Sequence, residues 1–303
     1  MDRRGFFATA GAAGVAAMAS RSFAGEHADR SADPFSMHFA PHFGMLRHLA
    51  GDDPVAQLEY AADVGFTAWE DNGMGGRSVE DQERLAGAMS RLGMTMGVFV
   101  LNRGTAWKAT FSRNNKDDRD AFLNECREAV EIAKRVNAKW ATVVLGTRHP
   151  RIDLSYQTAY AVEQLKRGCE ILEPHGLVMV LEPLNPRDHS NMLLAEMGHA
   201  YEICRAVGSP SCKILCDLYH QQITEGNLIP NIDRSWDEIA YFQIGDNPGR
   251  KEPTTGEINY ANVFKHIKAK GFEGILGMEH GLSRSGEDGE RALIDAYRAC
   301  DPA

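Results

Sequence analysis

From residue 36 onward, short apolar runs alternate with longer segments in which apolar residues recur every three or four positions. The short runs predict strands, and the segments between them predict helices. Because each run is uniformly apolar, the strands are expected in a buried parallel sheet. The expected strands are 37–40, 66–70, 94–100, 140–145, 177–182, 213–217, 239–244 and 275–279.

The segments between these strands carry signals of helix ends. Segment 53–64 begins with aspartates before Pro54, which is typical of a helix start, and segments 117–137 and 154–174 are longer versions. A glycine follows each of several segments, as expected for C-terminal caps. These glycines are Gly65, Gly93, Gly176, Gly208 and Gly271.

Eight strand–helix units in about 265 residues match a closed (β/α)₈ TIM barrel in size and count. No linker-like break interrupts them, so we expect one domain over 36–303. The alternative is an open, doubly wound sheet. However, no GxGxxG motif follows the first strand, and the run Gly73-Met74-Gly75-Gly76 after the second strand lacks that spacing.

The first 24 residues read as an export signal. Arg3 and Arg4 precede an apolar, Ala/Gly-rich run, and the small residues Ser22 and Ala24 flanking Phe23 suit a cleavage site, which together predict a twin-arginine signal peptide. Residues 25–35 then form a polar leader, the mature chain is expected in the periplasm, and no membrane-spanning segment is expected after cleavage. The alternative is a short N-terminal helix of the fold.

Charge and cysteine content restrict the partners. The formal net charge of −9 argues against a nucleic-acid or anionic-membrane surface. The six cysteines show neither a disulfide framework nor a zinc-knuckle spacing, so buried free thiols are expected.

Polar side chains stand at the ends of the last four expected strands: Glu182, Asp217, Gln243 and Glu279. In a barrel the carboxyl ends of neighbouring strands converge on one site. Three carboxylates and an amide oxygen aimed at one point would repel without a cation, and this all-oxygen set suits one Mn²⁺ or Mg²⁺ better than Zn²⁺. The alternative is that each residue caps a helix or pairs with a surface lysine. Glu70, from the opposite side of the ring, is expected to be structural.

Other residues near the strand ends are candidates for substrate contact. His220 lies three positions after Asp217, and Arg250 stands in a Pro/Gly-rich loop that is long enough to fold over the pocket. The planar guanidinium of Arg250 suits a substrate carboxylate. Asp246 could orient His220 or Arg250, and capping of a helix by His220 is the alternative to contact. Trp69 and Trp107, near the second and third strand ends, are expected to pack rather than to wall the pocket.

Four runs resemble the hydroxypyruvate isomerase family of xylose isomerase-like barrels: LEPLN (181–185), CDLYHQ (216–221), QIGDNPGR (243–250) and TGEINY (255–260). The resemblance covers about 36–282 and is specific over 178–280. It implies that the four strand-end residues bind the metal, that Glu182 and Glu279 form the acid/base pair, and that His220 and Arg250 contact substrate. Asp188 lies where the related sugar epimerases keep an acidic substrate contact. Those epimerases have histidine at position 243.

The sequence therefore predicts a metal-dependent isomerase of a small hydroxy-keto acid or sugar that works through an enediolate, with no organic cofactor. Hydroxypyruvate to tartronate semialdehyde is the type reaction that the resemblance implies. The alternatives are an exported epimerase, lyase or hydrolase acting on oxidised (3-keto) glycosides with the same metal site, and a non-catalytic sugar-binding protein. The sequence leaves the oligomeric state open, with a homo-oligomer possible.

Overall fold

The computed structural model describes residues 32–302. The expected signal peptide at 1–24 and most of the leader lie outside these residues. Within the described part of the chain, no helix is both long and apolar enough to cross a membrane.

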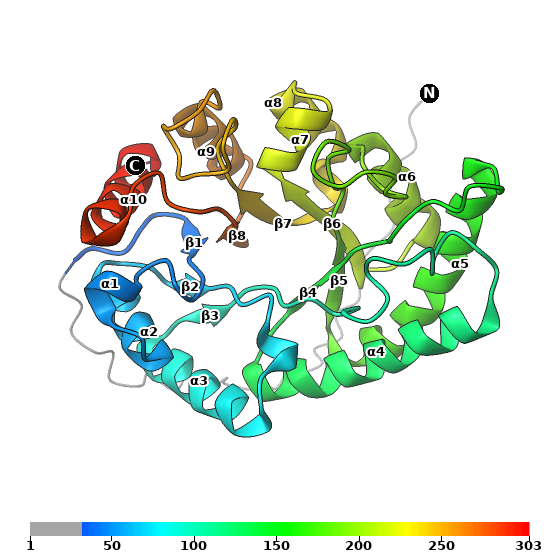
Figure 1. The fold of residues 1–303 in the computed structure, drawn as a ribbon, viewed down its shortest axis with the longest axis horizontal. Coiled ribbons are helices and arrows are strands. Elements are labelled where there is room, and N and C mark those ends of the chain that lie inside the picture. The colour runs from blue at the N-terminus through cyan, green and yellow to red at the C-terminus, as the bar shows by residue number, and fades with distance from the viewer. Residues whose placement is uncertain (1–31, 303) are drawn as a thin grey trace, which may run out of the picture.

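Eight parallel strands form the centre of the molecule, and helices surround them (Figure 1). The strands are β1 (His38–Ala40), β2 (Ala68–Trp69), β3 (Thr95–Met96), β4 (Trp140–Val143), β5 (Val178–Leu181), β6 (Cys212–Asp217), β7 (Ile239–Ile244) and β8 (Ile275–Met278). The α-helices are α1 (Arg47–Ala50), α2 (Pro54–Asp63), α3 (Val79–Leu92), α4 (Lys116–Val136), α5 (Leu154–Leu172), α6 (Met197–Val207), α7 (Leu218–Thr224), α8 (Leu228–Ser235), α9 (Tyr260–Ala269) and α10 (Gly286–Cys300). Short 3₁₀ helices are η1 (Met74–Gly76), η2 (Glu173–His175) and η3 (Trp236–Glu238).

The strands close into a ring. Six of them pair in the order β1-β8-β7-β6-β5-β4, and β2 pairs with β3. Parallel bridges between His42 and Glu70 and between Val100 and Thr142 join the two groups. The predicted (β/α)₈ TIM barrel is confirmed.

Two sets of apolar side chains fill the two sides of the strands. A small cluster inside the ring takes one residue from almost every strand: Ala40, Ala68, Val98, Val180, Leu215, Tyr241 and Ile275. A much larger cluster packs the outer faces of the strands against the helices. Burial on both faces explains why the strands read as continuous apolar runs.

Helix ends follow the local sequence signals. Asp53 caps α2 through the amide of Val55, and Pro54 takes the first helical position, where its missing N–H costs no hydrogen bond. Gly93 and Gly208 end α3 and α6 in the left-handed conformation, as predicted. All six cysteines are buried and free, which confirms the absence of a disulfide framework.

The strands β2 and β3 are shorter than the expected 66–70 and 94–100. Tyr241 reaches across the inside of the barrel from β7, and its hydroxyl accepts a hydrogen bond from the amide of Val98 (3.4 Å). Past Met96, backbone bonds between the two segments continue from the amide of Gly97 to Trp69 (2.7 Å) and from the amide of Asp71 to Val98 (3.4 Å), without regular strand pairing.

Candidate active site

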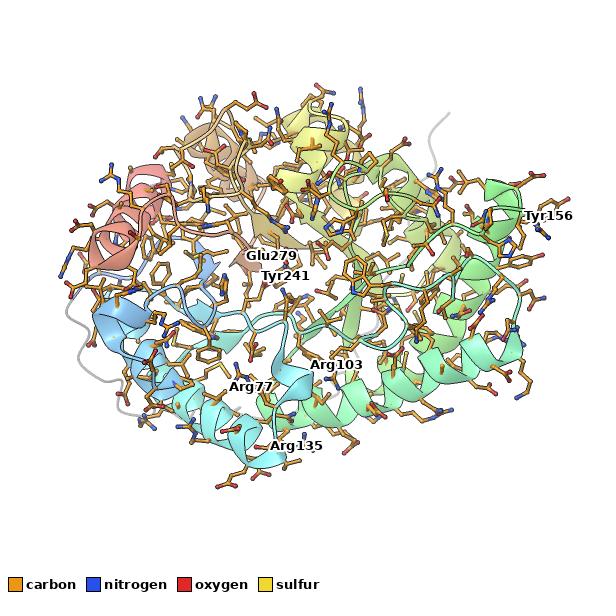
Figure 2. The ribbon with its side chains drawn as sticks, viewed as in Figure 1. Arg77, Arg103, Arg135, Tyr156, Tyr241 and Glu279 are labelled. Atoms are coloured by element: carbon orange, nitrogen blue, oxygen red, sulfur yellow. The ribbon has the colours of Figure 1, made fainter. Side chains whose placement is uncertain are left out.

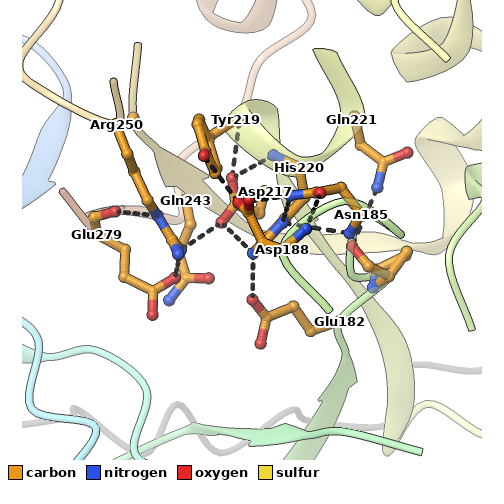
Figure 3. Close-up of polar contacts among 12 residues, drawn as sticks. Glu182, Asn185, Asp188, Asp217, Tyr219, His220, Gln221, Gln243, Arg250 and Glu279 are labelled. Atoms are coloured by element: carbon orange, nitrogen blue, oxygen red, sulfur yellow. Dashed lines mark hydrogen bonds and ion pairs between the residues drawn. The ribbon is translucent and has the colours of Figure 1, made fainter. Parts of the chain in front are cut away.

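The four predicted strand-end residues lie together at the carboxyl ends of β5 to β8 (Figure 3). Asp217 and Gln243 are register partners on β6 and β7, and Gln243 pairs in turn with Gly277 on β8, two residues before Glu279. Glu182 follows β5 directly. Glu182, Asp217 and Gln243 are buried, and Glu279 is partly exposed.

A cavity of about 350 Å³ opens beside these residues. Glu182 and Glu279 line it, together with His220 and Arg250, so the structure brings four of the predicted site residues to one space. A volume near the lower end of the range for ligand sites suits a small substrate.

The clustered carboxyl groups disturb one another. Burial, followed by the charges of Glu279 and Asp217, raises the pKa of Glu182 well above its usual value. Burial also raises the pKa of Glu279 to about 7, with a contribution from Asp217, while the guanidinium of Arg250 opposes the rise. A bound cation would relieve this repulsion.

The donor set fits a hard divalent metal. The side-chain amide of Gln243 donates to Glu70 (2.9 Å), while its oxygen is buried and, within residues 32–302, makes no hydrogen bond. Carboxylate oxygens of Glu182 and Asp217 lie within 4.8 Å of each other. An unpartnered buried amide oxygen beside carboxylates is what an oxygen-coordinated cation would satisfy.

His220 is held as a donor rather than as a ligand. Its Nδ1 atom accepts a hydrogen bond from the backbone amide of Asn185 (3.3 Å), which leaves the proton on Nε2. Nε2 faces Asp217 at 3.6 Å and Glu182 at 3.8 Å. Burial lowers the pKa of His220 to about 4, so the ring is neutral at pH 7 and presents one N–H to the cavity.

Arg250 lies between two of the acids. Its Nη2 donates to Glu279 (2.8 Å) and to Asp217 (3.3 Å), and its Nε donates to the carbonyl of Glu279 (3.0 Å). The guanidinium also lies over the ring of Tyr219, with its carbon 4.9 Å from the ring centre. Arg250 therefore lines the cavity with most of its donors already engaged.

Asp188 is exposed and does not line the cavity. Its Oδ2 accepts hydrogen bonds from the side-chain amide of Asn185 (3.0 Å) and from the hydroxyl of Tyr219 (2.8 Å), and these bonds lower its pKa. The carboxylate thus fixes Asn185, which orients His220, and Tyr219, which supports Arg250. The structure gives it a supporting position and leaves direct substrate contact a prediction.

Asp246 is placed differently from the expectation. Its Oδ1 accepts from the amides of Asn247 (2.9 Å) and Ile258 (3.1 Å), and its Oδ2 accepts from the amide of Gly256 (2.8 Å). The side chain is fully buried in the loop between β7 and α9 and does not line the cavity. It can act on Arg250 only by holding the loop that carries it.

Sequence reasoning missed several residues at the site. Trp107, expected to pack, is 57% exposed, lines the cavity and stacks on His189, with ring centres 5.4 Å apart. Asn72 and Arg103 line the cavity from the loops after β2 and β3. The signal that the sequence offered for these residues was their position after a strand end, and other residues of the same loops share that position.

Glu70 also joins the site from across the barrel. Its carboxyl group accepts from Tyr241 (2.7 Å) and Gln243 (2.9 Å), both on β7. Burial, with the charge of Glu279 adding, raises its pKa to about 8. A Cβ atom on Gly277 would overlap the Glu70 carboxyl group, so the glycine on β8 makes room for it.

Comparisons with known proteins bear on the family and the fold. Hydroxypyruvate isomerase of Escherichia coli K12 is 31% identical over 179 residues, covering 59% of this chain and 69% of that enzyme. The 2-oxo-tetronate isomerase of Pectobacterium atrosepticum is 31% identical over 162 residues, covering 53% of this chain and 62% of that enzyme. The crystal structure of the 3-keto-D-glucoside 4-epimerase YcjR from E. coli shares the fold, with a TM-score of 0.70, 18% identity, and coverage of 87% of this chain and 98% of that one.

A family model described as "Xylose isomerase-like TIM barrel" matches residues 58–300, which is most of the chain. The chain therefore belongs to the xylose isomerase-like TIM barrel family.

Proposed function

We propose that this protein is a metal-dependent isomerase of small hydroxy-keto acids, such as hydroxypyruvate or a 2-oxo-tetronate. The observation that carries the proposal is the group of buried Glu182, Asp217 and Gln243 and partly exposed Glu279 beside a small cavity, with the Gln243 oxygen left without a partner. The similarity to two isomerases of small keto acids supports the same reaction class.

The four residues would hold one divalent cation, for which Mg²⁺ or Mn²⁺ fits an all-oxygen donor set. When bound, the cation supplies positive charge that stabilises the enediolate formed during isomerisation. Because the carboxylates are already crowded, the site offers a cation strong electrostatic attraction.

Glu182 and Glu279 would exchange the protons. Isomerisation of hydroxypyruvate removes one proton from C3 and returns one to C2, while the hydroxyl proton moves to the former carbonyl oxygen. The two glutamates come from β5 and β8, on either side of Asp217 and Gln243, so they approach a substrate in the cavity from opposite sides. The Nε2–H of His220 can donate to a substrate oxygen.

The proposal is tested with protein loaded with Mn²⁺, by following exchange of the C3 protons of hydroxypyruvate in deuterium oxide and formation of tartronate semialdehyde. Glu279→Gln should lower the rate at least about 10³-fold, because it removes a proton carrier, with an unchanged circular dichroism spectrum. Glu273→Gln, on an exposed position before β8, is the matched control. Wild-type protein that binds hydroxypyruvate without exchanging its protons would overturn the proposal.

A second candidate function is epimerisation or elimination on an oxidised glycoside. The observation that favours it is Trp107, which is exposed at the cavity and stacked on His189, as an aromatic platform for a sugar ring would be. Product analysis with a 3-keto-glycoside separates these outcomes, because only elimination releases the aglycone.

We also propose that the chain is exported by the twin-arginine pathway. The adjacent Arg3 and Arg4 before an apolar run support this. Replacing both with lysine should retain the full-length chain in the cytoplasm, and mass spectrometry of periplasmic extracts would detect the mature chain.

A further inference from the structure

One arginine at the cavity is not used by the site described above. Arg103 follows β3 and lines the same cavity as Glu182 and Glu279, and it is labelled with Glu279 in Figure 2. Among residues 32–302, its side chain takes part in no hydrogen bond or ion pair. Arg250, by contrast, already donates to Asp217 and Glu279.

The guanidinium of Arg103 packs against a defined part of the backbone. A Cβ atom built on Gly75 would lie 3.1 Å from its Nε, and one built on Gly76 would lie 3.0 Å from its Nη1. The group therefore packs closely over the backbone of η1, where a larger side chain would push it away. This gives a role to the run Gly73-Met74-Gly75-Gly76, whose spacing does not fit a nucleotide-binding loop.

The loop that carries Arg103 is fixed on both sides. Asn102 donates to the carbonyl of Val144 (2.8 Å) and accepts from its amide (3.2 Å). On the other side, the amide of Gly104 donates to Glu125 (2.6 Å). The residues on both sides of Arg103 are thus held by hydrogen bonds, which favours one position for the Arg103 side chain.

Glu182 and Glu279 line the cavity together with two arginines, Arg250 and Arg103. Arg250 is paired with Asp217 and Glu279, whereas Arg103 brings a guanidinium whose N–H donors have no partner among residues 32–302. A carboxylate matches the planar fork of a guanidinium, whereas a neutral hydroxyl offers it only one weak acceptor. We propose that Arg103 binds the carboxylate of the substrate and thereby selects hydroxy-keto acids over neutral ketoses.

This inference rests on the proposed function, because it assumes that the reacting carbons lie at Glu182 and Glu279. The test compares hydroxypyruvate with dihydroxyacetone, its neutral counterpart, in the proton-exchange assay. Arg103→Gln should raise KM for hydroxypyruvate about 10- to 100-fold, with a smaller change in kcat and with kcat/KM for dihydroxyacetone within about twofold of wild type. Arg103→Lys should recover part of the loss.

Two further variants separate the effect of the position of the Arg103 guanidinium from the effect of removing a positive charge. Gly76→Ala keeps the arginine but displaces its guanidinium, so KM for hydroxypyruvate should rise about 3- to 10-fold while dihydroxyacetone is unaffected. Arg127→Gln removes an exposed arginine on α4 that does not line the cavity and should leave both substrates unchanged. If Arg103→Gln left hydroxypyruvate unaffected, or weakened both substrates equally, the inference would be overturned.

Failure of the proposed function would look different. In that case the wild-type protein would exchange protons of neither substrate, and calorimetry would replace the kinetic assay. Weaker binding of hydroxypyruvate to Arg103→Gln than to wild type would still support a carboxylate site, and equal affinities would overturn it.

Discussion

Glu70 shows how one buried carboxylate can define the role of its neighbour. One oxygen accepts from the side-chain amide of Gln243, and the other accepts from the hydroxyl of Tyr241. Because the amide nitrogen of Gln243 is held by Glu70, its oxygen points away from Glu70 and, within residues 32–302, has no hydrogen-bond partner. A residue expected to be merely structural therefore orients a candidate metal ligand.

We predict that Glu70→Gln weakens metal binding. A glutamine there would place an N–H group opposite one of the donors that the carboxylate now satisfies, so the Gln243 amide would lose its fixed orientation. The dissociation constant for Mn²⁺, measured by calorimetry, should rise about 10- to 100-fold. Tyr241→Phe removes the bond to the other oxygen and the bond from the Val98 amide, leaves the bond between Gln243 and Glu70 in place, and should change the constant much less. Equal constants for wild type and Glu70→Gln would contradict this prediction.

His280 is a buried neutral histidine beside the site. Its Nδ1 donates to the carbonyl of Gly281 (2.8 Å), and its Nε2 lies 2.9 Å from the hydroxyl of Tyr297. Burial lowers the pKa of His280 to about 3, with the charges of His42, Arg250 and Lys251 adding. The folded protein therefore resists protonating a ring that the unfolded chain protonates near pH 6.5.

The sign of the pH dependence follows. This contribution to the free energy of unfolding is fully present above pH 6.5 and is lost as the pH falls toward 3. The loss amounts to about 2 kcal/mol between pH 6.5 and 5. Urea unfolding of metal-free protein should show a smaller loss between pH 7.5 and 5 for His280→Gln than for wild type. Parallel pH profiles for the two proteins would show that His280 does not titrate in this way.

At the level of elements, the sequence predicted the strand–helix order because periodicity and helix caps are local properties. Gly93, Gly176 and Gly208 stand at left-handed positions as expected. The ends of β2 and β3 were predicted less well. Their backbone bonds become irregular past Met96, and the amide of Val98 bonds to Tyr241, about 140 residues further along the chain. No local pattern reports such a contact.

The same distinction holds for the candidate site. Asp217 and Gln243 were placed together because strand ends converge in a parallel barrel. The stacking of Trp107 on His189 joins two loops, and the position of the Arg103 guanidinium depends on the backbone of η1. These arrangements depend on how loops fold over the barrel, which residue spacing does not determine.

The loop between β7 and α9 offers a prediction at the element scale. Asp246 holds it through three backbone amides, and the loop carries Arg250 in a left-handed conformation (φ 51°). Asp246→Asn replaces one accepting oxygen with a donor, so at least one amide loses its partner. We expect trypsin to cleave after Arg250 or Lys251 at least about fivefold faster, because the loop opens locally more often.

A matched variant controls for general destabilisation. Asp233→Asn removes an exposed carboxylate on α8 that pairs with His266 and Lys270. It should leave cleavage of the β7–α9 loop unchanged. If Asp246→Asn were cut at the wild-type rate, the loop would be held by contacts other than this carboxylate.

On the scale of the whole molecule, the last helix is tied to the entry of the first strand. The Arg298 guanidinium donates to the carbonyls of Asp33 and Val64 (2.7 Å each) and lies over the ring of Phe35. Asp301, directly after α10, accepts hydrogen bonds from the amides of Ser36 (2.7 Å) and Met37 (3.2 Å). These contacts join the beginning and the end of the barrel where β1 pairs with β8.

We therefore predict that the link at Asp301 stabilises the closed ring as a unit. Asp301→Ala leaves the two amides without their acceptor and should lower the free energy of unfolding by about 1–3 kcal/mol, because each lost bond is to a charged group. For a chain of this size that corresponds to a fall in Tm of about 3–8 °C by differential scanning calorimetry. Asp295→Ala, on the exposed face of α10, is the control and should shift Tm by less than about 2 °C. Equal shifts for the two variants would mean that the contacts of Asp301 add nothing to closure, and that pairing of β1 with β8 alone holds the two ends together.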